Sequence, residues 1–172
     1  FLYPLNALME DQKQRLQEIL NGTNLRFAVY NGNLPEDDGG SAKTTSLRDK
    51  LLRQIAEERQ KYPNIVATRR ELRNNPPEII LTNPTMLEYM LLRNKDQNLF
   101  SQDSLRWIVI DEAHTFTGAG AAELSMLIKR VLNAFGTTAD KIRFATSSAT
   151  IGNSTDQSQK KLATERFIKQ LT

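Results

Sequence analysis

The chain has 172 residues, with 23 Lys and Arg against 20 Asp and Glu, one histidine and no cysteine. That length suits one ordinary domain, and a hydrophobic content of 39% suits a globular core. The lack of cysteine excludes disulfides, thiol catalysis and cysteine-ligated metals from these residues, and no apolar run reaches the ~20 residues of a membrane helix. A net charge of +3 permits a nucleic-acid partner without requiring one.

Short apolar strands and helices are expected to alternate along the chain. The expected strands are residues 1–3, 25–30, 79–81, 107–110 and 143–146. The expected helices are residues 5–20, 46–61, 65–73, 84–93, 124–135 and 162–171. Because the strands are apolar throughout, they indicate a mostly parallel sheet of about five strands with helices on both faces. The fold class is therefore α/β.

Spacing also predicts which side chains are buried. The apolar residues of the first helix share one face at intervals of three or four residues: Leu5, Leu8, Leu16, Ile19 and Leu20. Trp107 opens an apolar strand and is expected in the core, in preference to a base-stacking surface. The pairs Arg69-Arg70 and Lys129-Arg130 are expected on solvated helix faces.

Polar residues follow the last two expected strands, at the strand ends where parallel sheets bind ligands. Asp111, Glu112 and His114 come directly after strand 107–110. Adjacent carboxylates there suit a nucleotide–magnesium site, in which Asp111 holds Mg²⁺ through water and Glu112 activates an attacking water. The alternative is an ordinary acidic loop. Ser148 and Thr150 follow strand 143–146, and alone they indicate no more than a turn or a helix cap.

Two further polar segments join a strand to the start of a helix. Thr82, Asn83 and Thr85 follow strand 79–81, and Pro4 and Asn6 follow the first strand. The free N–H groups and the positive dipole end at a helix start favour phosphate. The alternative for both segments is plain N-capping, by Asn83 in the first of them.

In this order, the four segments together resemble the first motor domain of superfamily 2 DEAD/DEAH-box helicases. Residues 4–12 look like motif Ia, 82–87 like motif Ib, 111–114 like motif II in its Asp-Glu-Ala-His form, and 148–150 like motif III. The Thr-Asn-Pro-Thr-Met-Leu and Asp-Glu-Ala-His-Thr-Phe-Thr-Gly sequences look most like those of a bacterial and archaeal branch of large DNA helicases.

The resemblance implies a partial RecA-like domain over residues 1–172 of an ATP-dependent helicase or translocase. It implies ATP and Mg²⁺ as cofactors, nucleic acid as partner with DNA favoured over RNA, and a second RecA-like domain in the same longer chain. His114, Ser148 and Thr150 would couple the nucleotide state to nucleic acid. The segments holding Pro4 and Thr82 would grip phosphates. A cytoplasmic location without membrane contact is expected.

Two features depart from the family pattern. No Gly-Lys-Ser/Thr sequence of a Walker A loop occurs. In the family this loop precedes motif Ia, so we expect it upstream of Phe1, and we expect residues 1–172 alone not to hydrolyse ATP. Residues 36–68 are an expected surface insertion. The rival interpretation is a degenerate, non-catalytic RecA-like module that binds nucleic acid or docks a protein.

Overall fold

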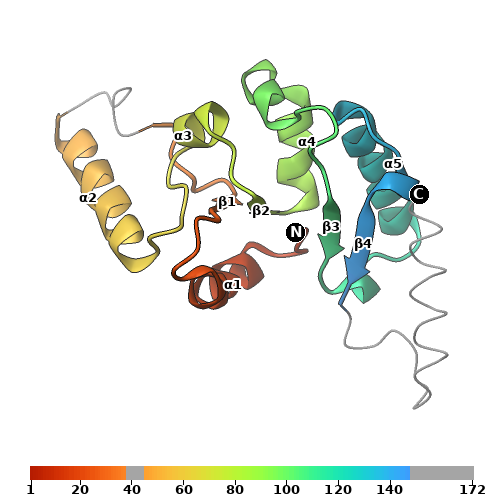
Figure 1. Cartoon of the computed structure of the whole chain (residues 1–172), viewed down its shortest axis with the longest axis horizontal. Coiled ribbons are helices and arrows are strands. Elements are labelled where there is room, and N and C mark those ends of the chain that lie inside the picture. The colour runs from red at the N-terminus through yellow and green to blue at the C-terminus, as the bar shows by residue number, and fades with distance from the viewer. Residues whose placement is uncertain (38–44, 148–172) are drawn as a thin grey trace, which may run out of the picture. The chain divides into compact units, whose positions relative to one another are not determined.

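The computed structural model describes residues 1–37 and 45–147 (Figure 1). The expected helix at 162–171 and the residues Ser148 and Thr150 lie outside this part. Contacts divide the chain into two compact units, Leu5–Met86 and Phe1–Pro4 with Leu87–Thr172. Within the described ranges, no helix combines the length and the apolar character that crossing a bilayer requires.

The unit Leu5–Met86 is built on a parallel strand pair. Its elements are α1 (Asn6–Leu20), β1 (Phe27–Tyr30), α2 (Thr45–Lys61), α3 (Arg69–Asn74) and β2 (Ile79–Thr82), followed by the start of α4 (Pro84–Leu92). β1 pairs with β2 from Phe27 opposite Ile79 to Tyr30 opposite Thr82. The other side of Phe27 bonds residues 64–66, because its N–H donates to Asn64 O at 3.0 Å and its carbonyl accepts from Val66 N at 2.8 Å. β1 is thus paired on both sides, and all four of its residues are buried.

The buried face of α1 differs from the expected one. Leu5 and Ile19 are 63% and 73% exposed, whereas Met9 is fully buried and Leu20 nearly so. The prediction that Leu5 and Ile19 lie in the core was therefore wrong. Leu16, at helical spacing from Met9 and Leu20, is partly buried. Both stripes have helical spacing, so spacing alone could not choose between them.

The second unit also rests on a parallel pair. After α4 come the short 3₁₀ helix η1 (Asn94–Leu99), β3 (Trp107–Ile110), η2 (Ala113–Thr115), α5 (Ala119–Ala134), η3 (Ala139–Lys141) and β4 (Arg143–Thr146). β3 pairs with β4 in parallel, and Leu2 forms a parallel bridge to Ile110. All strand pairings among the described residues are parallel, so the predicted α/β class with a mostly parallel sheet is confirmed.

The core of this unit lies between β3 and α5. Ile108 and Ile110 pack with the buried apolar stripe of α5, which consists of Leu124, Leu127, Ile128, Val131 and Leu132. Side chains alternate along a strand, so Trp107 points away from that core. It is 50% exposed, with the Arg143 guanidinium 5.4 Å from its ring centroid. The prediction of a core tryptophan was therefore wrong.

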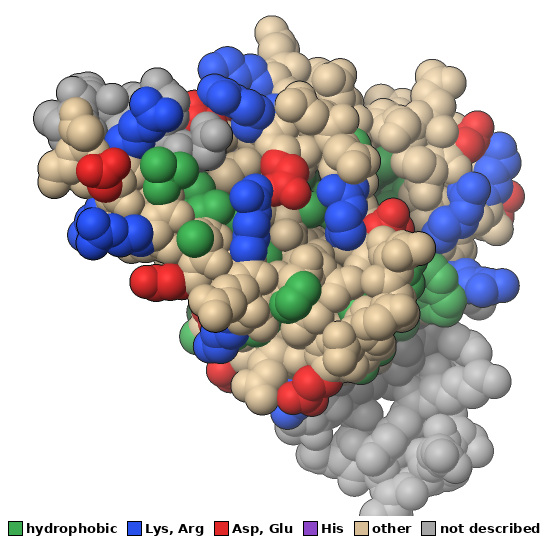
Figure 2. Space-filling view, turned by 60° about the vertical axis from the view of Figure 1, so that its left-hand side comes forward, with side chains coloured by type: hydrophobic (Ala, Val, Ile, Leu, Met, Phe, Trp, Pro, Cys, Tyr) green, Lys and Arg blue, Asp and Glu red, His purple; other side chains and the backbone are tan. Residues whose placement is uncertain are grey.

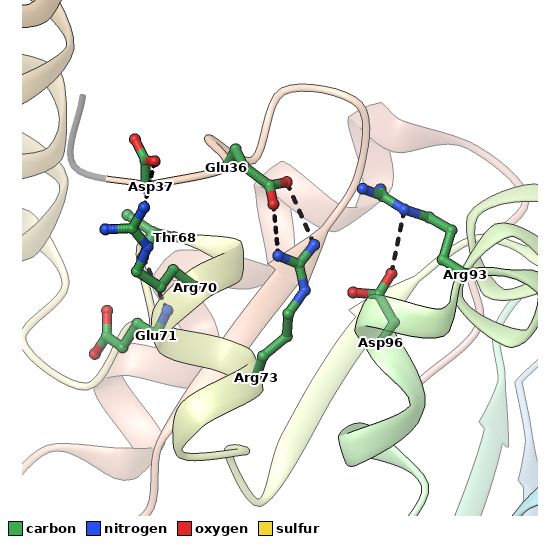
Figure 3. A network of polar contacts seen from close by, with 8 residues as sticks. All are labelled: Glu36, Asp37, Thr68, Arg70, Glu71, Arg73, Arg93 and Asp96. Carbon is green, nitrogen blue, oxygen red and sulfur yellow. Dashed lines mark hydrogen bonds and ion pairs between the residues drawn. The ribbon is translucent and has the colours of Figure 1, made fainter. Parts of the chain in front are cut away.

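Arg70, Lys129 and Arg130 are exposed, as predicted for solvated helix faces, and the arginines also form specific contacts. Arg69 lies 5.0 Å from the Tyr30 ring centroid. Arg70 forms an ion pair with the buried carboxylate of Asp37 at 2.7 Å (Figure 3). In the other unit, Arg130 of α5 pairs with Glu88 of α4 at 2.6 Å. These arginines therefore hold parts of each unit together.

The segment before residue 38 is fastened to the start of α3. The N–H groups of Arg69 and Arg70 donate to the carbonyls of Pro35 and Glu36 at 2.8 and 2.9 Å. The Glu36 carboxylate also pairs with Arg73 at 2.6 Å (Figure 3). Both backbone and side-chain contacts thus hold residues 35–36 against α3.

Candidate functional site

The acidic segment begins where β3 ends. Asp111 N donates to Leu2 O at 2.8 Å, so the parallel pairing reaches the first acidic residue. Glu112 then adopts a left-handed conformation, with φ 50° and ψ 45°. Residues other than glycine adopt this conformation at a cost in free energy. The carbonyl of Glu112 accepts hydrogen bonds from the N–H and the hydroxyl of Thr115, at 2.9 and 2.8 Å.

The side chains of Glu112 and His114 lie together. Oε2 of Glu112 is 3.1 Å from Nδ1 of His114, and both side chains are about one-third exposed. This oxygen is itself buried and accepts no hydrogen bond from the described residues. The two atoms are thus in close contact without hydrogen-bonding geometry. A carboxylate oxygen in this state retains its capacity to accept a proton.

Ser147, which the sequence analysis did not single out, contacts this segment from the end of β4. Its hydroxyl donates to Oδ1 of Asp111 and accepts from Glu112 N at 3.3 Å. This contact is possible because β3 and β4 are neighbours, paired in parallel from Trp107 opposite Arg143 to Ile110 opposite Thr146. The signal that could have found Ser147 is its place as the first residue after β4, the same position that drew attention to Asp111 after β3.

The pKa of Tyr3 reflects both the burial of its side chain and the negative charge of the acidic segment. It is 5% exposed. Burial, and secondarily the negative charge of Asp111, raise the pKa of Tyr3 to about 12. The phenol therefore stays protonated and neutral at ordinary pH.

The oxygen donors of the acidic segment fit a magnesium ion. Mg²⁺ takes oxygen ligands, keeps several waters and is commonly held by only one or two carboxylates. Asp111 is partly buried at the end of β3, and Glu112 follows with an oxygen that accepts no hydrogen bond from residues 1–37 and 45–147. No group of three or more metal-ligating side chains occurs in the described ranges. The donors present therefore suit a hydrated ion that a second ligand, such as a phosphate, completes.

The polar segment after β2 is built from neutral side chains. Oδ1 of Asn83 accepts from Met86 N at 2.8 Å, so Asn83 caps α4. Its amide nitrogen donates to Oδ1 of Asn6, the first residue of α1, at 2.8 Å. One side chain thus links the two expected phosphate-binding segments within the unit Leu5–Met86.

The remaining expected contact residues differ in accessibility. Thr82 is 4% exposed and donates its hydroxyl to Tyr30 O at 2.9 Å, so its side chain ties β2 to β1. Thr85 is exposed in the first turn of α4. Pro4 is partly buried and belongs to the other unit.

Basic side chains do not dominate the surface drawn in Figure 2. On that face Lys and Arg side chains are interspersed with Asp and Glu side chains. Residues 4–7 and 82–87 at the two helix starts contain no Lys or Arg, so a phosphate-binding role there would draw on backbone N–H groups.

Comparison with known proteins gives consistent matches. A sequence model of the DEAD/DEAH box helicase family matches residues 1–158. The Druantia protein DruE of Escherichia coli is 36% identical over 115 residues, which are 61% of this chain and 6% of that protein. The uncharacterized ATP-dependent helicase YprA of Bacillus subtilis is 27% identical over 158 residues, covering 89% of this chain and 17% of that protein.

Solved structures of one helicase also match. The DUF1998 helicase MrfA bound to DNA superimposes with a TM-score of 0.57 at 27% identity, covering 98% of this chain and 18% of that one. The same helicase bound to DNA and AMPPNP gives a TM-score of 0.53 at 25% identity, with 92% and 18% covered. The chain therefore spans less than a fifth of the length of each of these relatives.

Proposed function

The chain belongs to the DEAD/DEAH box helicase family, and from this premise we propose that it is part of an ATP-dependent helicase or translocase. The intact protein would couple ATP hydrolysis to movement along nucleic acid. The observation that carries this proposal is the acidic segment after β3, where Asp111, Glu112 and His114 meet the end of β4. The family match, and the description of YprA as an ATP-dependent helicase, support it.

The acidic residues take distinct roles in this proposal. Asp111 holds Mg²⁺ through water, and the ion neutralises charge on the ATP phosphates when bound. Glu112 accepts a proton from the attacking water. His114 lies beside Glu112 and, with Ser148 and Thr150, couples the nucleotide state to nucleic acid; the last two lie outside the described residues.

The segments after Phe1–Tyr3 and after β2 take the nucleic acid. Pro4, Asn6, Thr82, Asn83 and Thr85 shape the helix starts, where backbone N–H groups bind phosphates. Thr82 acts from a buried position, through its bond to Tyr30. Binding through phosphates is independent of base sequence. DNA is favoured because the MrfA structures hold DNA, and a second RecA-like domain of the same longer chain completes the motor.

Replacing Glu112 by Gln in the full-length protein tests the proposal. The amide keeps the shape of the side chain but cannot take a proton from water, so hydrolysis with single-stranded DNA should fall by roughly 10²–10⁴-fold. Binding of ATP, measured by fluorescence titration, should change little. Glu123→Gln is the matched control, because Glu123 is exposed on α5 and should retain wild-type turnover.

Two results would count against the proposal. Wild-type turnover by Glu112→Gln would remove Glu112 from the role of base. A folded full-length protein that binds DNA but shows no ATP hydrolysis would favour the non-catalytic module. Repeating the assay with single-stranded RNA decides which nucleic acid stimulates turnover.

A further inference from the structure

Ser147 is fixed beside the acidic segment by its own backbone. Its N–H donates to Ile110 O at 3.0 Å, and its carbonyl accepts from Ala113 N at 2.9 Å. These bonds enclose Asp111 and Glu112 on both sides along the chain. They involve only backbone atoms, so they persist whatever side chain stands at position 147.

The hydroxyl of Ser147 adds two contacts between those backbone bonds. It donates to Oδ1 of Asp111 and accepts from Glu112 N at 3.3 Å. A serine hydroxyl has one donor and two acceptor lone pairs, so both contacts form at once. One atom therefore sets the direction of the Asp111 carboxylate and holds the Glu112 peptide.

The Glu112 peptide has particular need of such support. Its left-handed backbone is unfavourable for a residue with a Cβ, and persists only where surrounding contacts hold it. Thr115 holds the carbonyl of Glu112, and Ser147 holds its N–H. Loss of the Ser147 hydroxyl would release one end of this residue while the backbone pairing of β3 and β4 remained.

From these contacts we infer that Ser147 is a positioning residue of the magnesium–ATP site. It orients Asp111 toward the hydrated ion and fixes the backbone from which Glu112 reaches the attacking water. It does so without touching substrate. This inference rests on the proposed function, because Asp111 and Glu112 have these roles only there.

Two substitutions of Ser147 by β-branched residues in the full-length protein isolate the contribution of the hydroxyl. Ser147→Thr keeps it, and Ser147→Val has the shape of threonine without it. The readout is the Mg²⁺ concentration that gives half-maximal binding of a fluorescent, non-hydrolysable ATP analogue. Loss of a hydrogen bond to a charged group should raise this concentration by roughly tenfold or more in Ser147→Val. Ser147→Thr should stay close to wild type.

Two further variants make the result decisive. Ser104→Ala removes an exposed hydroxyl in the same unit that bonds only Ser101 O, and it should leave the Mg²⁺ requirement unchanged. Asp111→Asn should raise the requirement by more than Ser147→Val does. Equal requirements for the Val and Thr variants, with a raised one for Asp111→Asn, would overturn the inference and leave the proposed function standing. An unchanged requirement for Asp111→Asn would overturn the proposed metal role, and the inference with it.

Discussion

The two parallel strand pairs end in polar segments of different chemical character. After β2, Asn83 caps α4 and bonds Asn6, both through neutral amide groups. After β3, Asp111 and Glu112 bring ionisable groups, a left-handed backbone and a buried oxygen that no described residue hydrogen-bonds. A satisfied amide network gives a rigid surface, whereas strained and ionisable groups persist mainly where chemistry requires them. The contrast agrees with the proposed division, in which the first segment binds nucleic-acid phosphates and the second carries out ATP hydrolysis.

The two pairs also differ in burial. Phe27 and Trp107 are both the first residue of a strand and pair with the first residue of the neighbouring strand. Phe27 is fully buried because residues 64–66 cover its other side, whereas Trp107 is 50% exposed beside Arg143. The first residue of β1 is therefore covered by other residues of its own unit, whereas the first residue of β3 is left half exposed to solvent.

The largest expected difference is in the free energy of unfolding. Phe27→Ala removes a fully buried ring and should cost about 3–5 kcal/mol, mainly through the cavity it leaves. Trp107→Ala should cost on the order of 1 kcal/mol, because half of its surface already contacts water. Urea denaturation of both variants measures the difference. Equal losses in the free energy of unfolding would show that the difference in burial between Phe27 and Trp107 does not affect stability.

A smaller effect should separate the two functions of Asn83. Asn83→Ala removes the helix cap and should cost about 1 kcal/mol of stability. Asn83→Asp keeps the capping oxygen but cannot donate to Asn6, and it places a negative charge near the expected phosphates. We therefore expect near-normal stability with weaker DNA binding for Asn83→Asp, measured by fluorescence anisotropy. Unchanged DNA affinity in both variants would show that this segment does not contribute to DNA binding.

The smallest effect is spectroscopic and concerns Tyr3. Its pKa is raised from 10.0 to about 12, so the folded state retains the phenol proton that the unfolded chain loses. Stability from this residue is complete below pH 10 and is lost as the pH rises to about 12. The tyrosinate absorbance of wild type minus that of Tyr3→Phe measures the titration. Asp111→Asn should lower the pKa of Tyr3 only slightly, since burial is the larger cause; titration near pH 10 would contradict the described burial.

The strands and the main helices could be predicted because their cause is local. Uniformly apolar runs such as Ile79–Leu81 predict buried parallel strands, and the stripe from Leu124 to Leu132 fixes the inner face of α5. The acidic segment could be located for the same reason, since it directly follows such a run. Its residue roles stay predictions.

The features that sequence could not supply depend on distant partners. Ser147 meets Asp111 only because β3 and β4 pair in one particular register, across a separation of 36 residues. Asn83 and Asn6 are 77 residues apart. Trp107 shows a further limit, because an apolar run does not reveal whether both faces of a strand are covered. Each outcome follows from tertiary pairing, which no local pattern encodes.

The bonds from Arg69 and Arg70 to Pro35 and Glu36 have an evolutionary consequence. They bring the two ends of the chain between 37 and 68 to one place, and within that stretch residues 64–66 are bonded to β1. We therefore expect related proteins to add or remove residues between 37 and 63, while residues 64–66 and the strand ends keep their spacing. Lengthening a loop whose ends are held together costs little free energy, because the entropy lost on closing a loop grows only slowly with its length. The region around α2 is therefore where we expect related proteins to differ most in length.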